Sequence, residues 1–154
     1  MHHLTLLSVG KIKSSWASDG CEDYIARLRH HLKLELIELP PSRNKDAQKQ
    51  REEESAQILH ACERMKGEPW LLDEYGKEFT SPLFAAFLGK ARDRGTPLTF
   101  ILGGAYGVTD AVRSAVKGSI RLSDMTLPHE LCRLLFLEQL YRACEIGKGT
   151  GYHH

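Results

Sequence analysis

The sequence has few cysteines, and none of them are clustered. Only four occur in 154 residues, and no two of them form a C-x-x-C pair. Zinc sites and thiol-redox motifs need that clustering, so the sequence predicts no metal site. We expect Cys21, Cys62, Cys132 and Cys144 to be reduced, mostly buried thiols of a cytoplasmic protein.

Long apolar runs and an excess of one charge are also missing. No run reaches the roughly 18 apolar residues of a membrane span, and no signal-peptide pattern opens the chain. We therefore expect no membrane contact. The 21 Lys and Arg residues nearly balance the 20 Asp and Glu residues, which gives a net charge of +1. Any contact with nucleic acid must therefore use a local basic surface.

Short apolar strands alternate with helical segments along the whole chain. The strands are expected at residues 4–9, 33–39, 69–73, 98–102 and 119–123. The helices are expected at residues 21–31, 45–65, 81–94 and 109–118, and from Pro128 onward, with Ser81 and Pro82 as N-cap and first residue of the third. This order predicts one α/β domain over residues 1–154, with a mostly parallel sheet and helices on both faces.

A glycine-rich loop follows the strand expected at 98–102. Ligands of open parallel sheets bind beyond the carboxyl ends of strands. Gly103, Gly104 and Gly107 would let a nucleotide approach the backbone closely, although a tight turn without a ligand would use the same residues. The G-x-G-x-x-G fingerprint does not fit. A dinucleotide site stays open because Asp124 follows Gly104 by 20 positions, where a ribose-binding acid could lie.

A polar loop, LSDMTLPHE (residues 122–130), follows the strand expected at 119–123. The Ser123 and Thr126 hydroxyls, with the backbone, could line an adenosine pocket beside the glycine loop. His129 falls in the first turn of the last helix, where the helix dipole disfavours a charged imidazole. Its neutral ring could accept a proton, or it could simply cap or pack against the helix.

The last helix has a very wide apolar stripe, and a glycine-rich tail follows it. The stripe consists of Leu131, Leu134, Leu135, Phe136, Leu137, Leu140, Tyr141 and Cys144. It predicts burial against the chain's own sheet and a second subunit, unless core packing alone covers it. In residues 147–154, Tyr152 is the only apolar side chain, so we expect only a ligand to hold this tail firmly.

Several strings together resemble the RlmH family of SPOUT-class methyltransferases. They are VGKIK (9–13), ILGGAYG (101–107), LSDMTLPHELCRLLFLEQLYRAC (122–144) and the terminal YHH. The resemblance implies a five-stranded α/β domain with a C-terminal trefoil knot. It also implies a homodimer that uses S-adenosylmethionine to methylate N3 of a pseudouridine. The target would lie in a stem-loop of large-subunit ribosomal RNA within the assembled ribosome.

The resemblance also assigns roles to particular residues. The cofactor-binding positions would be Leu72, Gly103, Gly104, Leu122, Ser123, Asp124, Met125, Thr126 and Leu127. The catalytic or substrate-binding positions would be His129, Arg142, Tyr152 and His153. Family tails often read Pro-Tyr-His, so Gly151 before Tyr152 implies a more mobile tail here. For Asp124 we expect no role beyond lining the pocket.

Two other functions and two basic clusters stay open at this point. The chain could be a nicotinamide-dependent oxidoreductase that uses the glycine loop and Asp124, or a non-catalytic ribosome-binding factor. The candidates for RNA contact are Arg113, Lys117 and Arg121, at four-residue intervals, and Arg43, Lys45, Lys49 and Arg51. Either set could equally be an ordinary solvated helix face.

Overall fold

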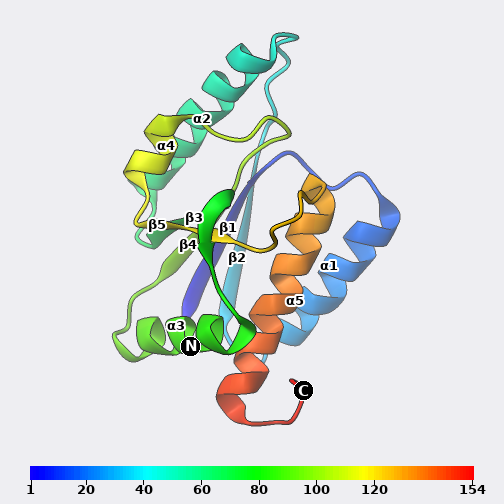
Figure 1. Ribbon diagram of the computed structural model, residues 1–154, viewed down its shortest axis with the longest axis vertical. Coiled ribbons are helices and arrows are strands. Elements are labelled where there is room, and N and C mark those ends of the chain that lie inside the picture. Colours follow the sequence, from blue (N-terminus) through cyan, green and yellow to red (C-terminus); the bar gives the residue numbers. More distant parts are fainter.

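A computed structural model describes residues 1–154 as a five-stranded sheet flanked by five helices (Figure 1). The strands are β1 (His3–Val9), β2 (Lys33–Leu39), β3 (Glu68–Glu78), β4 (Leu98–Leu102) and β5 (Gly118–Arg121). All pair in parallel, in the order β2-β1-β4-β3-β5. The predicted α/β fold with a parallel sheet is therefore confirmed, whereas the trefoil knot stays a prediction.

The helices cover both faces of the sheet, as predicted (Figure 1). They are α1 (Ser15–Leu28), α2 (Ala47–Arg64), α3 (Ser81–Asp93), α4 (Asp110–Ala115) and α5 (His129–Lys148). Buried residues of α1, α3 and α5 form one core cluster with the sheet, and those of α2 and α4 form a second, smaller cluster. The face covered by α1, α3 and α5 therefore carries most of the core, and the face under α2 and α4 is less completely covered.

Alternation along β1 shows how the sheet separates the two cores. Leu4 and Leu6 pack on the α5 side, and Leu7 and Val9 pack on the α2 side, because successive strand side chains point to opposite faces. The central strand β4 is buried at all five positions, as expected for a parallel strand covered on both faces.

The predicted helix starts differ from those in the structure by six residues for α1, by two for α2, and by one for α3, α4 and α5. Thr80, and not Ser81, is the N-cap of α3, and its hydroxyl accepts the Leu83 N–H at 3.3 Å. The Ser81 hydroxyl instead donates to Gln139 Oε1 at 2.6 Å. Pro128 is likewise the N-cap residue of α5, so His129 is the first helical residue.

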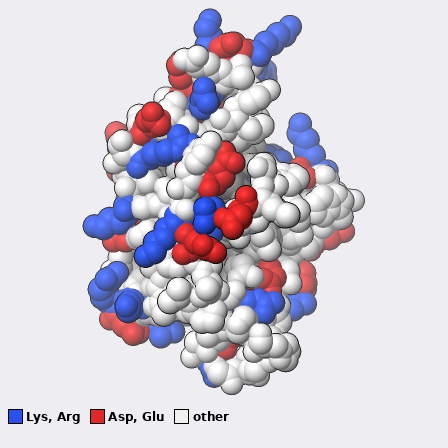
Figure 2. Space-filling view, in the orientation of Figure 1, with Lys and Arg blue, Asp and Glu red and all other residues white.

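Arg113, Lys117 and Arg121, the first set of candidates for RNA contact, do not lie on one helix. Helix α4 ends at Ala115, and the Lys117 N–H donates to the Pro69 carbonyl at 2.8 Å, on the way into β5. Arg113 pairs with Asp73 at 2.8 Å, and Arg121 pairs with Asp124 at 3.0 Å. Figure 2 shows basic and acidic side chains intermixed on this face of the molecule, without a continuous basic field.

The first turns of α5 are tied to the chain that follows β1. The Glu130 carboxylate accepts the N–H of Lys13 at 2.6 Å and that of Ser14 at 3.3 Å, and so caps α1, whose own N-cap side chain makes no capping bond. The buried Arg133 guanidinium donates to the Gly10 carbonyl at 2.9 Å and to Glu38 at 2.7 Å. These contacts fix the start of α5 at the carboxyl edge of the sheet.

None of the helices is both long enough and apolar enough to cross a membrane. No three His, Cys, Asp or Glu side chains are grouped so that they could bind a metal ion. All four cysteines are free thiols, as predicted, with Cys21 buried and the others half-buried.

Candidate functional site

A cavity of about 600 Å³ lies at the carboxyl ends of β3, β4 and β5. It is lined by residues 71–74 of β3, by residues 102–105, 107 and 108 after β4, by residues 122, 123 and 125–129 after β5, and by Cys132 of α5. The strand-end loops selected from the sequence therefore meet in one place, as the general rule for open parallel sheets predicts.

The structure brings together eight of the nine predicted cofactor residues. These are Leu72, Gly103, Gly104, Leu122, Ser123, Met125, Thr126 and Leu127. Asp124 does not line the cavity. Its side chain is 77% exposed and faces Arg121, so our expectation that it lines the pocket does not agree with the structure.

The size and chemistry of the cavity fit a nucleoside-type ligand such as S-adenosylmethionine. Its volume falls within the roughly 300–1,000 Å³ that small-molecule sites occupy, and nine of its eighteen lining residues are hydrophobic. Apolar walls suit the adenine ring. The backbone N–H groups of Thr126 and Leu127 have no acceptor within the chain, so they are free to donate to a ligand.

Sequence reasoning missed two acids in the lining, Asp73 and Glu74. They follow Leu72 directly, so the same strand-end rule could have selected them. Asp73 is already paired with Arg113. Glu74 is exposed and takes part in no ion pair, which leaves its charge available to a cationic ligand.

The glycines of the loop after β4 are required by the protein itself. A Cβ on Gly103 would lie 2.7 Å from Val108 Cγ1, and a Cβ on Gly104 would overlap the Glu54 carboxylate. Gly107 adopts a φ of +76° and donates its N–H to the Gly104 carbonyl at 3.0 Å. Close packing and a tight turn therefore explain these residues, which is the alternative that the sequence left open beside close approach of a ligand.

Helix α2 holds both ends of this glycine loop. Glu54, only 2% exposed, accepts the Ser42 N–H on Oε2 at 3.0 Å, and its Oε1 has no hydrogen-bond partner. The neighbouring Ser55 hydroxyl accepts the Thr109 N–H at 3.0 Å. The sequence predicted a mostly solvated helix here and gave no local sign of this contact.

His129 lines the cavity as a neutral, partly buried imidazole. Burial lowers its pKa, the Arg133 charge lowers it further, and a backbone hydrogen bond to Val9 and the Glu130 charge only partly oppose this. Its Nε2 atom is buried without a hydrogen-bond partner. The ring can therefore accept a hydrogen bond or a proton from a ligand.

Cys132 also lines the cavity, but its thiol is unreactive. Burial raises the pKa of Cys132 to about 11, so the thiol stays protonated near neutral pH. The thiolate is the nucleophilic form of cysteine, so Cys132 is not suited to attack a ligand.

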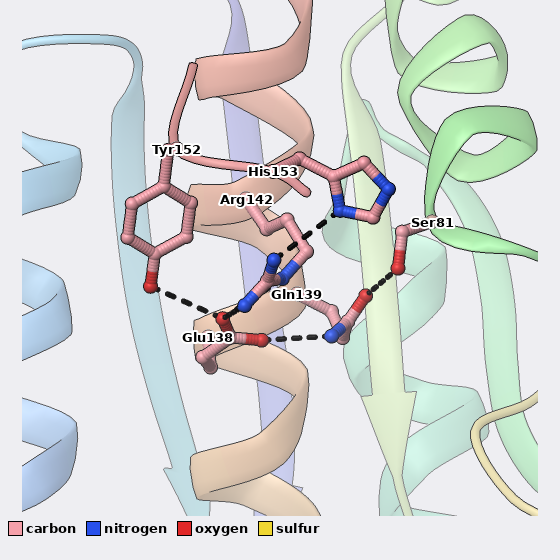
Figure 3. Close-up of polar contacts among 6 residues, drawn as sticks. All are labelled: Ser81, Glu138, Gln139, Arg142, Tyr152 and His153. Atoms are coloured by element: carbon pink, nitrogen blue, oxygen red, sulfur yellow. Dashed lines mark hydrogen bonds and ion pairs between the residues drawn. The ribbon is translucent and has the colours of Figure 1, made fainter. Parts of the chain in front are cut away.

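The other three predicted catalytic residues lie at the far end of α5 (Figure 3). Arg142 follows His129 by 13 positions on the same helix, which places them about 20 Å apart along its axis. Tyr152 and His153 contact Arg142. A single chain therefore does not bring these three residues to the cavity.

The C-terminal tail folds back against α5. Glu138 Oε1 accepts hydrogen bonds from Arg142 Nη2 at 2.7 Å and from the Tyr152 hydroxyl at 3.2 Å, and Arg142 lies 4.8 Å from the Tyr152 ring centre (Figure 3). The Tyr141 and Tyr152 rings meet edge to face at 5.0 Å. Contrary to our expectation, the tail thus has packing contacts within its own chain.

Two glycines make this reversal possible. Gly149 and Gly151 have φ angles of +67° and +82°, in the left-handed region that other residues rarely adopt. Proline, whose φ is restricted to about −65°, could not take the conformation of Gly151. Gly151 therefore serves a turn that docks Tyr152, and the tail is better held than the resemblance implied.

One face of α5 is not fully covered by the chain. Leu131 and Leu135 are only partly buried and belong to neither core cluster. Glu138 and Arg142 continue the same face at helical spacing. This set, termed the outer face of α5, is available to a partner.

Comparison with known proteins gives consistent matches along the whole chain. A family model described as "Predicted SPOUT methyltransferase" matches residues 2–153. A protein of Geobacter sp. (strain M21) named "Ribosomal RNA large subunit methyltransferase H" is 45% identical, and the match covers 98% of each chain. Proteins of the same name from Citrifermentans bemidjiense and Cytophaga hutchinsonii are 44% and 40% identical, over 98% of this chain and at least 98% of theirs.

Proposed function

Because this chain belongs to the SPOUT methyltransferase family, we propose that it is an S-adenosylmethionine-dependent methyltransferase of large-subunit ribosomal RNA. The relatives named for that activity match it over nearly their full length. The structural observation that supports the proposal most is the cavity at the ends of β3, β4 and β5, which fits the cofactor and contains His129.

The finer assignment follows the sequence resemblance. Residues 1–154 form one methyltransferase domain that modifies N3 of a pseudouridine in a stem-loop of the assembled ribosome. Because the substrate is part of the ribosome, the enzyme works in the cytoplasm. The cofactor supplies an electrophilic methyl group. Leu72, the Gly103-Gly104 turn and residues 122, 123 and 125–127 would hold it.

The chain's own residues must orient the target nitrogen and remove its proton. A protonated imide nitrogen is a poor nucleophile, so a base is needed near the methyl group. His129, neutral and with a free Nε2, is suited to accept that proton. Arg142 suits an RNA phosphate, and the Tyr152 ring suits stacking on an unpaired base.

These groups can act together only if a second copy contributes to the site. The distance of about 20 Å along α5 separates His129 from Arg142 in one chain. A homodimer that packs through the outer face of α5 would bring the tail of one subunit toward the cavity of the other. Partly buried Leu131 and Leu135 on that face support this arrangement.

No observation favours the alternatives. Asp124, which the oxidoreductase hypothesis requires as a ribose ligand, pairs with Arg121 outside the cavity lining. A non-catalytic ribosome-binding factor would not need a cofactor cavity with a free imidazole nitrogen.

Calorimetry and a transfer assay test the proposal. We expect S-adenosylmethionine to bind one site per chain and NAD not to bind. Labelled methyl groups should pass from the cofactor to ribosomes that lack the modification, and mapping should locate them at one pseudouridine. Binding of NAD in place of S-adenosylmethionine, or no transfer to any ribosomal RNA, would refute the assignment.

A further inference from the structure

A second and larger cavity, about 1,110 Å³, lies between α2 and the sheet, and extends from the amino ends of β1 and β2 along β2 to Leu39 at its carboxyl end. Most of its lining comes from residues 1, 2, 3 and 5 at the start of the chain, residues 35, 37 and 39 of β2, and residues 57, 60, 61 and 64–67 at the end of α2. This cavity shares no lining residue with the cavity at the ends of β3, β4 and β5. The proposed methyl transfer uses none of these residues.

The floor of this cavity has a polar end and an apolar end. On the α2 face, Ile37 and Leu39 of β2 line the apolar end, and Leu7, the strand partner of Ile37, lies in the core under α2. The next pair on that face, Thr5 and Glu35, is polar and lines the cavity. The polar end of the floor suits a hydrated, polar ligand.

The walls are predominantly cationic. Arg64, Lys66 and Arg92 line the cavity, and Glu35 is the only acid in the lining. Arg64 and Lys66 are exposed and take part in no ion pair, in contrast to Arg113 and Arg121. Four histidines, His2, His3, His31 and His60, also contribute to the lining. In a chain of net charge +1, this is a local concentration of positive charge.

We propose that this basic groove binds the phosphate backbone of a second segment of the RNA substrate, away from the target nucleotide. The inference rests on the proposed function, which makes RNA the anionic partner. The groove exceeds the roughly 300–1,000 Å³ of small-molecule sites, so it suits a polymer segment. Phosphate contacts orient a nucleic acid without reading its sequence.

A charge-reversal pair with a matched control tests the groove. The variant Arg64→Glu/Lys66→Glu removes its unpaired exposed cations, and Arg29→Glu/Lys90→Glu makes the same charge change at exposed positions outside it. We expect the groove variant to raise the KM for ribosomes about tenfold, with kcat at saturating ribosomes and S-adenosylmethionine affinity unchanged. The slope of log affinity against log salt should fall by about 2.

Direct filter binding to ribosomes separates this inference from the proposed function, because it needs no methyl transfer. A wild-type protein that binds ribosomes without methylating them would refute the function and leave the groove testable. Equal losses of ribosome binding in the groove and control variants would overturn the proposal that the groove binds RNA. So would unchanged binding of the groove variant, once circular dichroism shows that both variants are folded.

Discussion

The carboxylate of Glu54 lies directly against the backbone of Gly104, on the loop that lines the cofactor cavity. A Cβ on Gly104 would overlap Glu54 Oε1 and lie 3.1 Å from Glu54 Cδ. The other carboxylate oxygen of Glu54 accepts the Ser42 N–H. A buried side chain of α2 therefore shapes a loop that follows β4, far away in the sequence.

This contact predicts strong coupling between the two positions. Gly104→Ala alone should destabilise the protein by about 1–3 kcal/mol through overpacking and should weaken S-adenosylmethionine binding. Glu54→Ala removes the obstructing carboxylate, so the double variant should lose less than the sum of the single losses. Urea unfolding and calorimetry measure both effects.

Gly147→Ala is the matched control for this cycle, because Gly147 lies in α5 with no atom near its missing Cβ. It should be neutral or slightly stabilising. Strict additivity of Gly104→Ala and Glu54→Ala would show that the contact does not shape the loop.

The lowered pKa of His129 predicts a pH-dependent stability. The folded state disfavours protonation of the His129 imidazole. As the pH falls below about 6.5, the unfolded chain therefore binds more protons than the folded chain, and the free energy of unfolding decreases. His129→Gln should reduce the loss of unfolding free energy between pH 7.5 and pH 5.5. Part of the loss should persist, because burial also lowers the pKa of His31.

Denaturant unfolding at the two pH values measures this difference, with His154→Gln, an exposed tail position, as the control. An unchanged pH dependence in His129→Gln would show that His129 is not held neutral by its surroundings. His129→Gln should also lose methyl transfer while it still binds S-adenosylmethionine.

The outer face of α5 predicts where the proposed dimer can be disrupted without unfolding. Leu135 is partly buried and outside both core clusters, so Leu135→Glu should give a folded monomer. Leu137 is completely buried in its own chain, so Leu137→Glu should unfold the protein. Sedimentation and circular dichroism separate the outcomes, and a wild-type monomer at micromolar concentration would contradict the proposed dimer.

The tail should be needed for transfer and dispensable for folding. Deletion of residues 152–154 removes a ring that packs on Tyr141 at the surface, so the loss of stability should be small. Methyl transfer should fall by about a hundredfold, because the substrate is no longer positioned. Tyr152→Phe keeps the ring and loses only the hydroxyl bond to Glu138, so it should retain most activity. Methyl transfer at the full rate by the truncated enzyme would show that the tail has no role in the reaction.

Local patterns were sufficient for the strands at 33–39 and 98–102, which the structure reproduces residue for residue. They were also sufficient to bring the strand-end loops together, because parallel strands end at one edge. Local patterns failed where contacts between residues far apart in the sequence determine the structure. Sheet pairing of β5 shortens α4, and nothing near Glu54 in the sequence signals Gly104.

The tail was misjudged for a related physical reason. Its glycines indicated freedom, but Gly149 and Gly151 adopt positive φ angles that place Tyr152 on α5. Glycine content shows that a turn is possible and cannot show what the turn docks against. The aromatic and charged surface that receives Tyr152 is formed only when α5 is in place.

Mixing two inactive subunits tests the central claim, a methyltransferase site shared between two chains, most directly. His129→Ala should inactivate the cavity of its own chain, and deletion of residues 152–154 should inactivate the cavity of the partner. After unfolding and refolding an equal mixture, the account predicts about a quarter of wild-type methyl transfer to ribosomes, because half of the dimers carry one complete site. No activity in the mixture, with an active wild-type control refolded in the same way, would contradict a site shared between subunits.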